Sequence, residues 1–233
     1  MCEFINAQFG HLLTTLDLCW LARADMDEFA AAVYRKGCPL DDVWGFIDGT
    51  FRPTCRPGED HRTVYSGHYR LHGIKFQSIM APNGIVINLD GPWVGRRHDS
   101  GILADSGLLR ALETKMEQMG KIFCLYGDPA YPISAYLEGP FKPATTQIEF
   151  DFNEAMSAYR IAVEWGFGEV VQQFAFLDFR KNLKIFVQPV RLLYTVGTLL
   201  LNCRVCLGYG GKVADYFCLA PPTLEVYLNN IRD

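Results

Sequence analysis

The apolar residues of this chain change their spacing near residue 40, and that change restricts the fold to a mixed α/β class. In residues 1–36 they recur three and four positions apart, which predicts a helical lead-in that ends at Gly37 and Pro39. Short apolar runs bounded by Gly, Pro or Asn follow at residues 43–50, 73–80 and 84–89. Such runs predict strands, and the turn residues at 81–84 predict that the last two strands form a hairpin.

The rest of the chain alternates between helical and strand patterns. Helices are expected at residues 99–119, 151 to about 174 and 190–207, and a buried strand at 121–126. Asp151 and Glu154 have the spacing of a capping box, which predicts the start of the second of these helices. The expected fold is therefore a mixed sheet flanked by helices, with residues 1–40 as a short helical lead-in.

Composition and charge narrow the class of protein further. Apolar residues make up 49% of the 233 residues, which is enough for the core of one domain. The net charge of −4 argues against a surface dedicated to nucleic acid, so any DNA contact must be local. The eight cysteines follow no disulfide rhythm, which favours a reducing, intracellular compartment. Neither a signal peptide nor a membrane span is expected.

Three acidic residues occupy positions where an acid is hard to explain by structure alone. Asp48 and Asp128 each end an apolar, strand-like run. Glu164 shares a helix face with Phe167 and Val171, and that face should point inward. Since an isolated buried carboxylate is costly, three converging ones imply a compensating cation. Oxygen ligands without His or Cys favour Mg²⁺ or Mn²⁺.

Each acid taken singly also has an ordinary structural explanation. An Asp at the end of a strand is often only a turn former, which applies to both Asp48 and Asp128. A Glu within an amphipathic helix, such as Glu164, is commonly solvated or paired with a basic side chain. The placement of the carboxylates therefore leaves both interpretations open.

Four sequence blocks carry a resemblance to a known family. In order along the chain they are FIDGT (46–50), YSGHYRLHGIKFQ (65–77), GDPAYP (127–132) and VEWGFG (163–168). Together they resemble the blocks of Harbinger-group DDE transposases, and the similarity runs from about residue 42 to residue 222. Residues 129–163, 35 in all, separate Asp128 from Glu164, which matches the spacing in that group.

The resemblance implies an RNase H-like catalytic domain, here residues 41–225, that cleaves or joins DNA with two Mg²⁺ or Mn²⁺ ions. It implies that Asp48 lies on the first strand, Asp128 just after the fourth and Glu164 on a later helix, as the three catalytic, metal-binding acids. Asp99 matches a further acid of the group and is implied as a fourth metal ligand. An N-cap for the helix from Ser100 is the structural alternative for Asp99.

One basic stretch accompanies the proposed site. Residues 51–75 hold five Lys or Arg and three His against two acids, and Arg96 and Arg97 follow. Phosphate contacts near the site are expected from some of these side chains, although many such arginines are simply solvated. The DNA-binding candidates are Arg52, Arg62, His68, Arg70, Lys75, Arg96 and Arg97. Gly166 and Gly168 predict a close approach of backbone or DNA, because a glycine within a helix is unfavourable.

Two functions of different classes remain open. One is an active endonuclease or strand-transferase; the other is a catalytically silent module that binds DNA or protein on the same fold. Members of the group ordinarily carry a helix-turn-helix-like region before the catalytic core, and too few residues precede Asp48 to form it. We therefore expect a separate DNA-recognition protein, or a chain that is part of a longer transposase. A nuclear location and a homo-oligomer are further expectations.

Overall fold

A mixed sheet lies at the centre of the computed structural model, which describes residues 1–209 and 211–230 except for the side chains of residues 158 and 160–163. Its six strands are β1 (Val43–Pro53), β2 (Tyr65–Ser66), β3 (Leu71–Met80), β4 (Val86–Val94), β5 (Cys124–Tyr126) and β6 (Leu137–Glu138). Strand β3 is antiparallel to β1, β2 and β4, whereas β5 is parallel to β1 and to β6.

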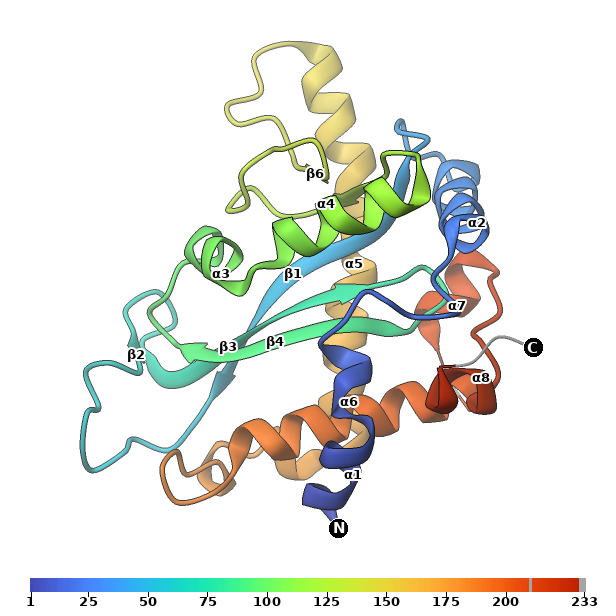
Figure 1. Cartoon of the computed structure of the whole chain (residues 1–233). Helices are drawn as coiled ribbons and strands as arrows, with labels where there is room; N and C mark the ends of the chain where they lie inside the picture. Colours follow the sequence, from blue (N-terminus) through green and yellow to red (C-terminus); the bar gives the residue numbers. More distant parts are fainter. Residues whose placement is uncertain (210, 231–233) are drawn as a thin grey trace.

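Helices cover both faces of this sheet. The α-helices are α1 (Cys2–Phe9), α2 (Arg23–Arg35), α3 (Asp99–Ser106), α4 (Leu108–Met119), α5 (Gln147–Gln173), α6 (Val190–Cys206), α7 (Lys212–Phe217) and α8 (Leu224–Asn229). Short 3₁₀ helices span Gly10–Leu13, Ala175–Leu177 and Arg180–Asn182. In Figure 1, α4 crosses in front of the sheet and α5 passes behind it. The expected fold class is confirmed, because a mixed sheet flanked by helices is consistent with an RNase H-like nuclease.

Burial explains why β1 and β3 form the middle of the sheet. Residues 43–47 and 73–80 are buried without alternation, as expected for strands covered on both faces. The predicted hairpin of β3 and β4 is confirmed, with Met80 opposite Val86. Gly84 has φ +83° in the turn between them, a conformation that favours glycine.

The helical lead-in is shorter and more broken than expected. Residues 14–22 are not α-helical, and Leu16, Leu18, Trp20 and Leu21 in this segment are buried. The apolar residues of this segment are therefore buried without forming a helix face. The predicted helix over residues 99–119 is likewise two helices, because Gly107 between α3 and α4 has φ +71°.

The start of α5 also differs from the prediction. The capping box is formed by Thr146 and Glu149, not by Asp151 and Glu154. The Thr146 Oγ1 accepts from the Glu149 N–H at 3.3 Å, and the Glu149 carboxylate accepts from the Thr146 N–H at 2.9 Å. Bonds from the backbone and side chain of Thr145 also reach Glu149 and help to lower its pKa. Both residue pairs have the three-residue spacing of a capping box. The hydrogen bonds that Thr145 and Thr146 donate to Glu149 distinguish the pair that forms it.

Candidate active site

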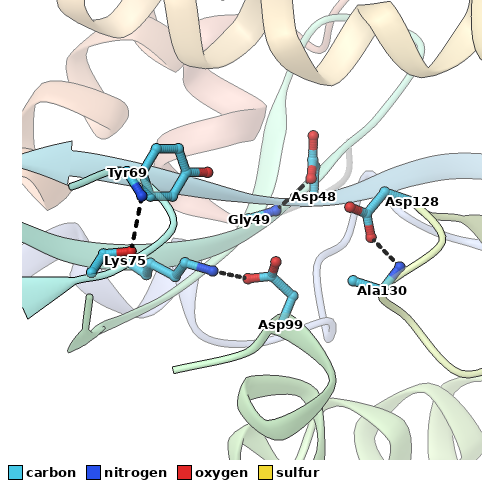
Figure 2. Close-up of polar contacts among 8 residues, drawn as sticks. Asp48, Gly49, Tyr69, Lys75, Asp99, Asp128 and Ala130 are labelled. Carbon is cyan, nitrogen blue, oxygen red and sulfur yellow. Dashed lines mark hydrogen bonds and ion pairs between the residues drawn. The ribbon is translucent and has the colours of Figure 1, made fainter. Parts of the chain in front are cut away.

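Strands β1 and β5 bring Asp48 and Asp128 to the same place. The two strands are parallel neighbours, and their register pairs Phe46 with Tyr126. Asp48 lies two residues after Phe46, and Asp128 lies two residues after Tyr126. Equivalent positions on adjacent parallel strands lie on the same face, about 4.8 Å apart while the strands stay paired. The register therefore predicts that the two carboxylates are neighbours, and Figure 2 shows them so.

Asp99 reaches this place from the first turn of α3. The N-cap of α3 is His98, so the alternative explanation of Asp99 as the N-cap is wrong. Its carboxylate instead accepts a hydrogen bond from Lys75 Nζ at 2.9 Å, as part of an ion pair. Asp99 also packs against β1, since a Cβ added at Gly49 would lie 2.6 Å from Asp99 Oδ1. Only glycine beside Asp48 allows Asp99 to come this close.

Glu164 completes a group of four carboxylates around one cavity. The acidic cavity, as we name it, has a volume of about 520 Å³ and is lined by Asp48, Asp99, Asp128 and Glu164, together with Thr50, Phe51, Arg52, Tyr69, Phe167, Gly168 and Val171. Figure 2 shows the three aspartates gathered around one space. Segments from β1, β5, α3 and α5 thus converge on this cavity.

The expectation that Glu164 points inward is wrong in one respect. Phe167 is buried and Val171 is half-buried, but Glu164 is exposed. This face of α5 lines the acidic cavity and does not only pack on the sheet. A side chain over the cavity, such as that of Glu164, can therefore contact solvent. The three aspartates are half-buried.

Two tyrosines report how closely the aspartates converge. Burial raises the pKa of Tyr131 well above its ordinary value, and the charges of Asp99, Asp48 and Asp128 raise it further. The same causes, in the same order, raise the pKa of Tyr69. Both phenols therefore remain protonated near neutral pH. A shared effect of three carboxylates on the same two rings indicates a concentrated negative potential.

Hydrogen bonds orient two of the carboxylates. Asp48 Oδ1 accepts from the Gly49 N–H at 2.7 Å, and Asp128 Oδ1 accepts from the Ala130 N–H at 2.9 Å. Both bonds are local. The turn-former explanation is wrong for Asp48, because β1 continues beyond it to Pro53 and pairs Asp48 with Ser78 of β3. It fits Asp128, which follows β5 and begins a turn in which the Tyr131 N–H donates to the Asp128 carbonyl at 3.1 Å. A turn at Asp128 and a position in the cavity are compatible.

The residues present fit a hard divalent cation. Four carboxylates supply only oxygen ligands, the kind that Mg²⁺ and Mn²⁺ prefer. The buried hydroxyl of Tyr131 lies in the potential of the aspartates and has no hydrogen-bond partner among the described residues. A water of a hydrated ion would supply one, since Mg²⁺ usually keeps several waters. Within the described part of the chain, no three His, Cys, Asp or Glu are close enough together to form a ready metal cluster.

The DNA-binding candidates divide by location. Arg52 lines the acidic cavity, where its Nη2 donates to Thr50 Oγ1 at 2.8 Å and its guanidinium lies 5.3 Å from the Tyr194 ring centre. A second cavity of about 470 Å³ is lined by His68, Lys75, Arg96 and Arg97 among others. Arg70 lines a third cavity. Arg62 is exposed and lines none of these three.

Some residues of the site had no signal in the sequence. Phe51 and Tyr69 stack with their ring centres 4.3 Å apart, and both line the acidic cavity. Tyr69 stands within the basic stretch, where a search for charged residues passes over it. Phe51 lies within β1, and no local pattern distinguishes it from the buried residues of the same strand. Their partnership requires β1 and the loop after β2 to meet.

The two glycines of α5 have different surroundings. A Cβ at Gly166 would lie 1.9 Å from Met80 Cε, which explains that glycine by contact between helix and sheet. A Cβ at Gly168 would meet nothing within 4 Å, although Gly168 lines the acidic cavity. The predicted close approach of backbone is thus correct for Gly166. At Gly168 the open space belongs to the cavity.

We expect alanine at these two positions to have different effects on stability. Both substitutions gain about 1 kcal/mol of helix propensity. Gly166→Ala also overpacks against buried Met80, which costs about 1–3 kcal/mol. Urea unfolding should therefore show Gly168→Ala to be more stable than Gly166→Ala by about 1–3 kcal/mol. Equal stabilities would contradict the packing of α5 on β3.

The fold and the cavity together define a class of protein. Asp48 lies within β1, Asp128 just after the parallel neighbour β5 and Glu164 on the later helix α5, in a mixed α/β fold that is consistent with an RNase H-like nuclease. A family model described as DDE superfamily endonuclease matches residues 47–202, a segment that contains all four acids. The chain belongs to the DDE superfamily endonuclease family.

Membership of this family supports a nuclease or transposase-like function with DNA as substrate. The family normally uses divalent metals. Neither the curated proteins nor the solved structures contain a match to this chain. Among the helices that the structure describes, none is both long and apolar enough to span a membrane.

Proposed function

We propose that this chain is a DNA endonuclease or strand-transferase of the Harbinger group that depends on Mg²⁺ or Mn²⁺. In this proposal Asp48, Asp128 and Glu164 are the catalytic acids, and Asp99 is a further metal ligand. One observation carries it: all four acids line a single cavity within the segment that matches the endonuclease family. We also propose a nuclear location, a separate protein that supplies DNA recognition, and assembly as a homo-oligomer.

The acids would act on both binding and chemistry. Four carboxylates around one cavity repel a phosphate, so the scissile phosphate can enter only when their charge is neutralised. Divalent ions bound there would do this, and would activate the attacking water or 3′-hydroxyl and stabilise the leaving oxygen. Asp48 is held within β1 and Asp128 by the turn that follows β5, which limits their movement. Glu164 lines the same cavity from α5.

Two neighbours would position the substrate. Arg52 is fixed by Thr50 and by the Tyr194 ring, and a fixed guanidinium in the cavity wall can bind a phosphate oxygen with little loss of side-chain entropy. Gly168 lies one helical turn after Glu164 on the same face of α5. Without a side chain there, a DNA strand can come close to the helix beside Glu164.

A metal titration of DNA cleavage tests the proposal. Purified chain is incubated with supercoiled plasmid and with short duplexes in Mg²⁺, in Mn²⁺ and in EDTA. We expect nicked or linear products with either metal and none with EDTA. A folded chain that binds DNA but cleaves it under none of these conditions would instead be the silent binding module.

A further inference from the structure

We infer that the second cavity binds a phosphate of the DNA strand that adjoins the phosphate to be cut. This inference rests on the proposed function and assigns the strand a path through the site. The basic cavity, as we name it, is the one of about 470 Å³ that is lined by His68, Lys75, Arg96, Arg97 and His98. The third cavity, lined by Arg56, Arg70, His72, Arg180 and Lys181, holds as many basic side chains but shares no lining residue with the acidic cavity.

The two cavities adjoin along a shared wall. Tyr69, Asp99 and Asp128 line both of them. In Figure 2 the Tyr69 hydroxyl points toward the aspartates, and Lys75 reaches Asp99 from the basic side. A strand that places one phosphate in the acidic cavity therefore has only this wall to pass before it reaches the basic cavity. Successive phosphates of one strand can occupy the two cavities together.

Most cations of the basic cavity already have partners. Lys75 is paired with Asp99, and its side chain is only 11% exposed. Arg97 is paired with Asp105, donates to the Gly101 carbonyl, and lies 5.6 Å from the Trp93 ring centre. The Lys75–Asp99 pair belongs to the shared wall, and the contacts of Lys75 and Arg97 leave both side chains little freedom to bind a ligand.

Arg96 differs from these neighbours. It is exposed, and it makes no hydrogen bond or ion pair with the residues that the structure describes. His68 and His98 lie exposed in the lining of the same cavity, and the side chain of His98 makes no bond that caps α3. An unpaired guanidinium in a cavity that two imidazoles also line can bind a phosphate with charge-assisted hydrogen bonds.

The two cavities differ in how their carboxylates are balanced. The acidic cavity admits a phosphate only with metal, whereas in the basic cavity Lys75 is paired with Asp99, so that Arg96 can bind a phosphate without metal. Arg96 should therefore contribute to DNA affinity in EDTA, where no cleavage takes place. This condition separates strand binding from the chemistry of the acids.

The test compares two arginine variants in a DNA-binding assay. Arg96→Gln removes the charge from the basic cavity; Arg110→Gln removes a similar exposed charge from α4, outside both cavities. Binding of a short duplex is measured in EDTA over a range of salt concentrations. We expect Arg96→Gln to bind about five- to tenfold more weakly at 0.1 M salt, with a salt slope smaller by about 0.9, and Arg110→Gln to match the parent. Parental affinity and slope in Arg96→Gln would overturn the inference.

A neutral methylphosphonate, placed at one phosphate after another, locates the contact. When the neutral group replaces a phosphate beside the cleavage position, the parent should lose affinity. Arg96→Gln already lacks this contact, so its affinity should not fall further at that position. If every position weakens both proteins equally, Arg96 does not hold an adjoining phosphate. If the parent never cleaves DNA in Mg²⁺, the proposed function is wrong and no cleavage position is defined. Weaker DNA binding by Arg96→Gln than by Arg110→Gln would still show a phosphate site. The two failures are thus distinguishable.

Discussion

Glu164→Gln, Asp48→Asn and Asp128→Asn should each lower the rate of Mg²⁺-dependent DNA cleavage by roughly 100- to 1,000-fold, while the protein stays folded. Each substitution keeps the volume of the side chain and its ability to form hydrogen bonds. Each removes one negative charge from the acidic cavity, and with it part of the affinity for a divalent cation. Because the carboxylates repel one another without metal, the amides should leave stability unchanged or slightly raised.

A matched control separates charge in the cavity from charge elsewhere. Glu113 is exposed on α4 and lines neither cavity, so Glu113→Gln should cleave at the parental rate. Initial rates on a labelled duplex are compared for all four variants, with thermal unfolding as the test of folding. Near-parental cleavage by well-folded cavity variants would rule out the catalytic assignment of these acids.

Lys75→Met should have the largest effect on stability. The Lys75 and Asp99 side chains are 11% and 18% exposed, so solvent screens their ion pair only weakly. Removing the ammonium leaves the Asp99 carboxylate in a negative potential without its partner. Allowing for the remaining solvent contact, we expect the metal-free protein to lose about 2–4 kcal/mol of unfolding free energy.

Two further measurements assign that loss to the charge. Lys75→Met combined with Asp99→Asn should recover most of the stability, because no uncompensated carboxylate remains. Added Mg²⁺ should stabilise Lys75→Met more than the parent, because a bound cation takes over the role of the ammonium. The measurement is urea unfolding in EDTA and in Mg²⁺. A Lys75→Met variant with parental stability in EDTA would show that the ion pair is of little consequence.

Local pattern determined much of this protein. The apolar runs and the turn at residues 81–84 were sufficient to predict β1, β3, β4 and their hairpin, because burial and turn chemistry act between near neighbours. The same runs placed Asp128 just after a strand, which is confirmed, but they placed Asp48 at the end of the first strand, whereas β1 continues to Pro53. The resemblance added the order of these strands, and β5 is the fourth strand when the two-residue β2 is set aside.

Tertiary structure alone decided how the acids and bases are partnered. The side-by-side position of Asp48 and Asp128 depends on the register of β1 with β5, whose pairing joins residues about 80 positions apart. Lys75 and Asp99 are 24 residues apart, so no local pattern predicts their ion pair. Because of this pair, Lys75, which was expected to contact DNA, forms part of the wall between the cavities. Charge and hydropathy of a side chain are local properties, whereas its partner and its exposure depend on which distant segments pack around it. For this reason sequence could name the basic residues, but only the folded chain distinguishes Arg96, which has no partner in the described structure, from Lys75 and Arg97, which have theirs.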